Sequence, residues 1–113
     1  MAEWKEIVTV ADWEEVVGRS HEAPLFVFKH STQCPISAGA YQEAEAYLQN
    51  DPREDATYVL VKVIESRPVS NQVAEDLDVK HESPQAFVVK NKKEVWHASH
   101  RAITEQAIRE ALG

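Results

Sequence analysis

Short strand-like runs alternate along this chain with stretches of helical periodicity, and this order constrains the fold more than any other feature. Leu25–Phe28 is continuously apolar, as expected for a strand that is covered on both faces. Tyr58–Ile64 is rich in β-branched residues and predicts a second buried strand. Between these two runs, apolar residues recur at the spacing of one helix face: Ile36, Ala40, Tyr41, Ala44, Tyr47 and Leu48.

Local signals mark where further elements begin and end. Lys5–Val10 is a short, half-polar strand candidate. Asp12 offers a side-chain oxygen as the N-cap of a helix that ends near Gly18. Pro68 opens another helix. The apolar face of that helix is formed by Val69, Val73, Ala74 and Leu77.

The C-terminal third of the chain predicts a β-hairpin and a closing helix. Ala86–Val89 and Val95–Ala98 flank a turn at Asn91–Lys92, and Thr104 can cap the last helix. Early strands joined through helices pair in parallel by right-handed crossovers, whereas the hairpin adds antiparallel strands. The sequence therefore predicts a single α/β domain over residues 1–113, with a mixed central β-sheet of four to five strands flanked by helices on both faces.

The cysteine count and the N-terminus bear on the cellular compartment. The chain has 113 residues and one cysteine, so it can form no internal disulfide. A secreted domain of this size usually carries several paired cysteines, so we expect a reducing, cytoplasmic location. The N-terminal residues have no basic start followed by an apolar run, and no stretch approaches the ~20 apolar residues of a membrane span. Neither a signal peptide nor a membrane anchor is predicted.

The charge and the histidines disfavour several partners. The formal net charge is −7, which argues against nucleic acid and anionic membranes, because both attract clustered Lys and Arg. His97 and His100 are three residues apart, but on a strand or loop they need not face one point. With no second cysteine nearby, no metal site is predicted.

Cys34 lies between the buried strand that begins at Leu25 and the amphipathic helix that begins at Pro35. Pro35 fits the first helical turn, the one position in a helix that tolerates a missing N–H. The first amides of a helix are unpaired and carry partial positive charge, which stabilises a thiolate. A free cysteine is also among the most buried residue types, so an inert core thiol is the alternative. The polar neighbours Thr32, Gln33 and Ser37 favour a reactive thiol instead.

At this point the sequence resembles a known family. Cys34-Pro35-Ile36-Ser37 resembles the C-P-x-C motif of thioredoxins and glutaredoxins, with Ser in place of the second Cys. Ser83-Pro84 resembles their cis-proline site, followed here by the strand Gln85–Lys90. More narrowly, Thr32 to Ser37 together with Glu82-Ser83-Pro84-Gln85 resembles the monothiol bacilliredoxins, which include general stress proteins of the bacillithiol system. The resemblance spans nearly the whole chain and implies a thioredoxin-like fold.

The resemblance also implies an activity. Bacillithiol is a low-molecular-weight thiol that forms mixed disulfides with oxidised protein cysteines. The Cys34 thiolate of such a protein attacks the bacillithiol sulfur, frees the client thiol and carries bacillithiol until a second thiol releases it. Ser37 cannot resolve this intermediate, because a hydroxyl forms no disulfide. The implied co-substrate is bacillithiol, the implied partners are S-thiolated client proteins, and the expected oligomeric state is a monomer or weak dimer.

The same resemblance assigns the site residues. Cys34 is the catalytic nucleophile, and Pro84 is expected beside it. The residue before Pro84 offers its backbone N–H and C=O to an extended client or thiol, in the manner of an added β-strand. A plain turn proline at the start of a strand is the alternative. The predicted substrate- and thiol-binding residues are Thr32, Gln33, Pro35, Ser37, Ser83 and Pro84.

Two alternative functions remain open on the sequence. A redox sensor or adaptor would be thiolated once at Cys34 and would change a protein contact. A monothiol glutaredoxin-like carrier would bind an iron–sulfur cluster, but such carriers usually have Gly where Pro35 stands.

The roles of three basic residues near the predicted site also remain open. An imidazolium at His30 or His81 would favour the Cys34 thiolate, whereas a solvated surface histidine would not. Lys29 could attract a carboxylate of the thiol, or it could point away from the site on its strand.

Overall fold

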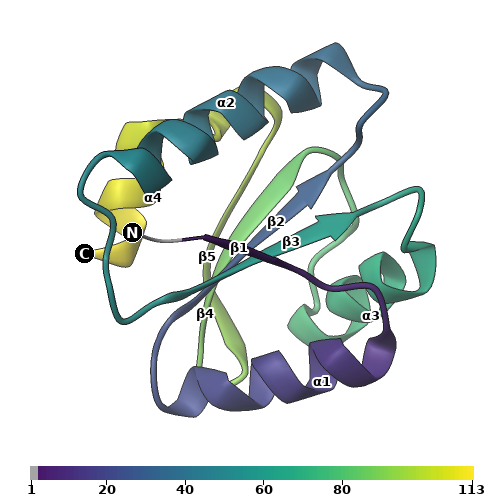
Figure 1. Ribbon diagram of the computed structural model, residues 1–113. Helices are drawn as coiled ribbons and strands as arrows, with labels where there is room; N and C mark the ends of the chain where they lie inside the picture. The colour runs from purple at the N-terminus through teal and green to yellow at the C-terminus, as the bar shows by residue number, and fades with distance from the viewer. Residues whose placement is uncertain (1–2) are drawn as a thin grey trace.

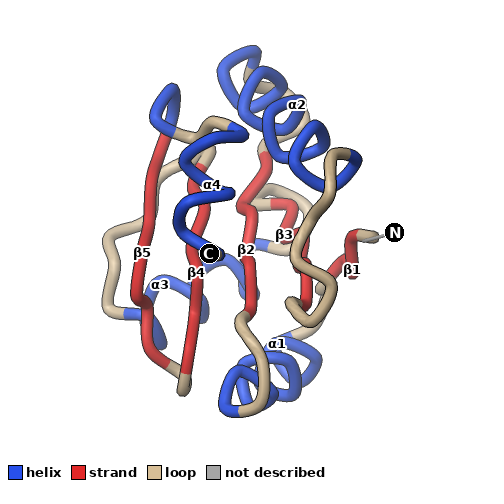
Figure 2. The backbone as a smooth tube through the Cα atoms, turned by 90° about the vertical axis from the view of Figure 1, so that its left-hand side faces the viewer, coloured by secondary structure: helices blue, strands red, loops and turns tan. Residues whose placement is uncertain are grey.

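In the computed structural model, which describes residues 3–113, five strands form one mixed sheet in the order β1-β3-β2-β4-β5 (Figures 1 and 2). β1 and β2 each pair in parallel with β3, whereas β4 pairs antiparallel with both β2 and β5. The predicted α/β fold with a mixed sheet is confirmed. The strands are β1 Trp4–Glu6, β2 Leu25–His30, β3 Thr57–Lys62, β4 Gln85–Lys90 and β5 Lys93–Ser99.

Helices cover both faces of this sheet, as predicted (Figure 1). The α-helices are α1 Val10–Gly18, α2 Pro35–Gln49, α3 Arg67–Leu77 and α4 Glu105–Leu112. Two short 3-10 helices are η1 Arg19–His21 and η2 His100–Ala102. α1 and α3 pack on one face, and α2 and α4 pack on the other. No helix within residues 3–113 is long and apolar enough to cross a membrane.

β2 lies at the centre of the sheet, and its side chains alternate between the two cores. Leu25 and Val27 belong to the core under α1 and α3, whereas Phe26 and Phe28 belong to the core under α2 and α4. All four are almost fully buried, as the continuous apolar run predicts. Because β2 is fixed in the middle of the sheet, its end also fixes the position of the start of α2.

The predicted hairpin is confirmed, and its turn has a clear backbone cause. Asn91 and Lys92 connect β4 to β5, and both adopt positive φ, 55° and 62°. Two consecutive left-handed residues match the right-handed twist of the flanking strands in a two-residue hairpin loop. Asn tolerates this conformation better than most residues do.

Two expectations for the N-terminal segment are wrong. β1 ends at Glu6 instead of Val10, because Ile7 turns into the core and Val10 already begins α1. The N-cap of α1 is Thr9 instead of Asp12. Thr9 is extended, with φ −127° and ψ 154°, and its Oγ1 accepts the backbone N–H of Asp12 at 3.1 Å.

Some residues predicted on apolar faces are not in the core. The Ile36 side chain begins the predicted apolar face of α2 but is 41% exposed. Ile64 is 44% exposed, because β3 ends at Lys62 and Ile64 lies in the turn that follows. Tyr41 and Ala74 are only half-buried. The exposed Ile36 lies two residues after Cys34, so its side chain forms part of the surface around the thiol.

The N-cap assignment predicts a stability difference between two neighbouring variants. Thr9→Ala removes the oxygen that caps α1 and is expected to lower the free energy of unfolding by about 1 kcal/mol. Asp12→Ala removes only a charge in the first turn, so its effect is expected to be about half as large. Urea unfolding followed by circular dichroism measures both. A larger loss for Asp12→Ala would contradict the assignment.

Candidate active site around Cys34

Cys34 stands at the junction between β2 and α2, as the sequence predicts. β2 ends at His30, and a turn follows in which the backbone N–H of Cys34 donates to the Ser31 carbonyl at 3.3 Å. Cys34 is the N-cap of α2, with extended φ −111° and ψ 121°, and Pro35 follows as the first helical residue. The cysteine is half-buried and unbonded to another sulfur.

Cys34 stands at the N-terminal end of α2. The Cys34 side chain accepts no capping hydrogen bond from α2. The first N–H groups of a helix have no partner within it, and they carry the positive end of the helix dipole. Cys34 is therefore placed at the positive end of the α2 dipole.

Ser37 is fully buried one helical turn after Cys34, and its hydroxyl is engaged on two sides. The Oγ accepts the backbone N–H of Ser31 at 2.9 Å and lies 2.8 Å from Nδ1 of His30. These two contacts tie the first turn of α2 to the end of β2. Ser37 therefore shapes the loop that carries Cys34, a role that the sequence did not reveal.

His30 is held as a neutral ring. It stacks on Tyr41 with ring centroids 4.8 Å apart, and on Phe28 with centroids 5.7 Å apart. Burial lowers the pKa of His30 below its usual value, and Lys62 lowers it further, although Glu65 acts in the opposite direction. At neutral pH this histidine supplies no imidazolium to the thiol. Its structural role is the contact with Ser37.

Lys29 points to the opposite face of the sheet from His30. Its side chain is fully buried, its Nζ donates to Nδ1 of His81 at 3.2 Å, and it lies 5.8 Å from the centre of the Phe87 ring. Burial lowers the pKa of Lys29 to about 8. The expectation that Lys29 could meet a carboxylate of the thiol does not fit this placement, because the ammonium does not reach solvent.

His81 connects Lys29 to the segment before Pro84. Its Nδ1 also lies 3.4 Å from the Ser70 hydroxyl of α3. Burial lowers the pKa of His81, and the positive charges of Lys29 and Arg67 lower it further. His81, like His30, is therefore neutral at pH 7, and the imidazolium hypothesis is not supported for either residue.

The two polar residues before Cys34 are exposed. Thr32 donates to a carboxylate oxygen of Glu65 at 3.4 Å, a long contact across the surface. Gln33 is exposed as well. Both side chains lie on the surface next to Cys34, where an incoming molecule can contact them.

Ser83 and Pro84 lie at the same edge of the sheet as the end of β2. Gln85, directly after Pro84, pairs with Lys29 in the antiparallel register of β2 and β4. The Ser83–Pro84 peptide bond is cis. The Ser83 hydroxyl is buried without a hydrogen-bond partner among residues 3–113. In the same part of the chain, Ser83 takes no part in the backbone hydrogen bonds of loops and turns.

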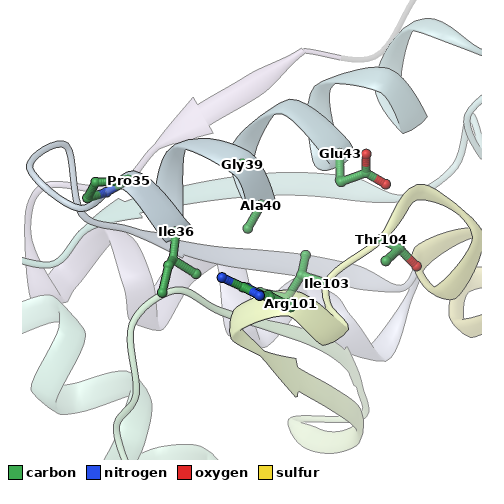
Figure 3. A pocket seen from close by; sticks show the side chains of 8 residues that line it. All are labelled: Pro35, Ile36, Gly39, Ala40, Glu43, Arg101, Ile103 and Thr104. Atoms are coloured by element: carbon green, nitrogen blue, oxygen red, sulfur yellow. The ribbon is translucent and has the colours of Figure 1, made fainter.

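A groove between α2 and the segment after β5 was missed by the sequence analysis. It encloses about 560 Å³ and begins at Pro35 and Ile36, next to Cys34 (Figure 3). Arg101 from η2 points into it. The backbone N–H of His100 donates to the Pro84 carbonyl at 3.1 Å, so η2 is joined directly to the Pro84 loop. The only sequence signal for Arg101 is a cation between the hairpin and the last helix.

Solved structures similar to this fold define the class of protein. One is described as "a putative oxidoreductase with a thioredoxin fold"; it shares 32% identity, the match covers 96% of this chain and 92% of that chain, and the TM-score is 0.84. Thioredoxin from Fasciola hepatica shares the fold at 19% identity, with coverage of 96% and 95% and a TM-score of 0.73. Thioredoxin from Trypanosoma brucei brucei does so at 10% identity, with coverage of 97% and 88% and a TM-score of 0.76. The chain is a thiol–disulfide oxidoreductase of the thioredoxin fold.

The family follows from a second comparison. The model of the family described as monothiol bacilliredoxin BrxC matches residues 5–108. The chain therefore belongs to the monothiol bacilliredoxin family, as the motifs around Cys34 and Pro84 predict. Within residues 3–113, no group of three or more His, Cys, Asp or Glu side chains is placed to hold a metal ion.

The buried ammonium predicts a pH-dependent stability. Between about pH 8 and pH 10.5, Lys29 is protonated in the unfolded chain but neutral in the folded protein, so its contribution to stability rises with pH. Lys29→Met removes this dependence. We expect the free energy of unfolding of Lys29→Met, relative to wild type, to fall by on the order of 2 kcal/mol between pH 7 and pH 10.5.

Urea unfolding of both proteins at pH 7, 8.5 and 10.5 measures this difference. Tyrosines and other groups titrate in both proteins and cancel in the comparison. A difference that stays constant with pH, or that grows in favour of the variant, would show that Lys29 keeps an ordinary pKa in the folded protein.

Proposed function

We propose that this protein removes bacillithiol from S-bacillithiolated client proteins, with Cys34 as the only nucleophile. The observation that carries the proposal is the position of Cys34, a half-buried N-cap of α2 followed by Pro35 as the first helical residue. Membership of the monothiol bacilliredoxin family supports the choice of small thiol. Bacillithiol is the proposed co-substrate, the proposed partners are thiolated proteins, and the proposed location is the cytoplasm.

The reaction proceeds in two exchanges that balance in atoms and electrons. First, the Cys34 thiolate attacks the bacillithiol sulfur of the client's mixed disulfide, the client thiolate leaves, and a proton from solvent neutralises it. Second, the thiolate of a free bacillithiol attacks the bacillithiol sulfur bonded to Cys34 and displaces the Cys34 thiolate. The products are a reduced client and bacillithiol disulfide, and the protein is unchanged.

The hydroxyl at Ser37 supports the one-cysteine route. It occupies the place of the second cysteine in the C-P-x-C motif, and it is already bonded to Ser31 and His30. It can therefore neither attack the mixed disulfide nor leave its pocket without breaking two buried contacts. An external thiol is therefore needed to resolve the mixed disulfide between Cys34 and bacillithiol.

The segment around Ser83 supports docking of the client. Its backbone N–H and C=O make no bond with loops and turns of residues 3–113, and they lie at the edge of the sheet that carries Cys34. An extended chain next to the oxidised cysteine of a client can pair with them as an added strand. Thr32 and Gln33, directly before Cys34, are exposed and can contact the same client.

The direct test of this proposal is turnover on a defined substrate. A model protein with one cysteine is prepared as its bacillithiol mixed disulfide and, in parallel, as its glutathione mixed disulfide. With excess free bacillithiol, catalytic amounts of wild-type protein are expected to release many equivalents of bacillithiol, measured by intact mass. Release from the bacillithiol adduct is expected to be faster, and Cys34→Ala is expected to leave only the uncatalysed rate.

Other outcomes of this experiment point elsewhere. Equal rates for the two adducts would indicate a general monothiol reductant without selectivity for bacillithiol. One bacillithiol captured per Cys34 without further release would contradict the enzyme and favour the redox sensor.

A second prediction tests the placement of Ser37. Ser37→Cys puts a thiol one helical turn from Cys34, within the Cα separation that a disulfide spans. Mild oxidation is expected to give an internal disulfide, seen as a monomer of mass reduced by two hydrogens that lacks free thiols. The control is Cys34→Ala combined with Ser37→Cys, which can form only intermolecular disulfides. Two free thiols that persist in the single variant after oxidation would contradict the placement.

A further inference from the structure

The groove beside Cys34 joins one helix to a distant part of the chain. One wall is the first two turns of α2, and the other is the segment from η2 to the start of α4 (Figure 3). The lining residues are Pro35, Ile36, Gly39, Ala40, Glu43, Arg101, Ile103 and Thr104. Its volume of about 560 Å³ lies in the range of small-molecule sites.

The groove carries an unpaired positive charge on a strongly acidic protein. Arg101 takes part in none of the ion pairs formed among residues 3–113. The carboxylate of Glu43, at the other end of the groove, already accepts the backbone N–H of Glu105 at 3.0 Å. Arg101 therefore has no carboxylate partner among residues 3–113, and its fork of N–H donors fits a carboxylate.

The floor between these charged groups is apolar. Ile36, Ala40 and Ile103 face the groove from its two walls. Ile36 is exposed to solvent although it is a large apolar residue, and it lies within the first turn after Cys34. A ligand that covers Ile36 and reaches Arg101 would have one end next to the thiol.

The mixed disulfide brings two different groups to Cys34, and the structure offers two surfaces for them. The backbone of Ser83 suits an extended protein segment, whereas the groove between α2 and η2 has the size of a small-molecule site. The hydrogen bond from His100 to the Pro84 carbonyl holds the two surfaces next to each other. Both surfaces therefore flank one thiol.

We propose that this groove binds the small-thiol half of the mixed disulfide, and that Arg101 binds its carboxylate. This inference rests on the proposed function, and it makes Arg101 a specificity-determining residue for thiols that carry a carboxylate. Binding positions the small-thiol sulfur at Cys34, so the client thiol becomes the leaving group. The chemistry of the exchange is unchanged.

The experiment compares two adducts of the same model protein, one with bacillithiol and one with the uncharged thiol 2-mercaptoethanol. Because the client is identical, its contacts cancel in the ratio of the two transfer rates to Cys34, measured by intact mass. Arg101→Ala is expected to slow transfer of bacillithiol about tenfold, equivalent to about 1.4 kcal/mol, and to leave transfer of 2-mercaptoethanol unchanged. Arg101→Lys is expected to recover only part of the rate, because it keeps the charge without the fork.

Lys93→Ala is the matched control. Lys93 is an exposed cation at the hairpin end of β5, so its loss changes the net charge equally but away from the groove. We expect it to change neither rate. An Arg101→Ala variant that slows both adducts equally would place Arg101 on the client instead. A variant that slows neither would also overturn the proposal.

A binding measurement separates this inference from the proposed function. If wild-type protein transfers neither adduct although iodoacetamide still alkylates Cys34, the proposed function fails. S-methyl bacillithiol, which cannot exchange, then tests the groove alone through chemical shifts of the Gly39 amide. Shifts that saturate in wild type and vanish in Arg101→Ala would support the groove, and no shifts in wild type would overturn it.

Discussion

The double burial of β2 is the constraint on which the rest of the structure depends. A central strand covered by helices on both faces must alternate large apolar side chains between two cores, and Val27 and Phe28 do this without leaving space for water. The rigidity of that strand determines where the chain enters α2. The packing of β2 therefore determines the position of Cys34. Its backbone lies at the start of a helix, next to the end of the central strand.

The alternation of β2 also separates its last two residues. His30 faces α2, where it stacks on Tyr41 and where burial lowers its pKa, whereas Lys29 faces the other core and reaches His81. Neither supplies a positive charge at the thiol, which stands instead at the start of a helix. The hydroxyl of Ser37 serves the loop in place of a second thiol, which fits a protein that works with one cysteine.

Three segments far apart in sequence meet around that thiol. The register of β2 and β4 brings Pro84 to the end of β2, and the hydrogen bond from His100 brings η2 to Pro84. Because η2 also faces the start of α2, the groove and the Ser83 backbone flank the same residue. This arrangement supports the proposal that the protein holds both halves of a mixed disulfide.

Local signals in the sequence by themselves determined the elements and the position of Cys34. The apolar run of β2, Pro35 at the start of α2 and the turn at Asn91 act over a few residues, so they can be read without knowing the fold. The error in the N-cap of α1 arose where two local signals compete. Thr9 and Asp12 can both cap a helix, and the extended backbone at Thr9 decides between them.

The tertiary structure alone decided the partners of the site residues. Periodicity places Ile36 on the same helix face as Ala40, but the sheet ends before it can cover Ile36. The lowered pKa of His30 depends on burial by the packed elements and on the charge of Lys62 at the end of β3. Arg101 follows Cys34 by more than sixty residues in the sequence. Only the packing of the folded chain brings η2 next to α2. Such contacts arise from packing between elements, which no local pattern of residues encodes.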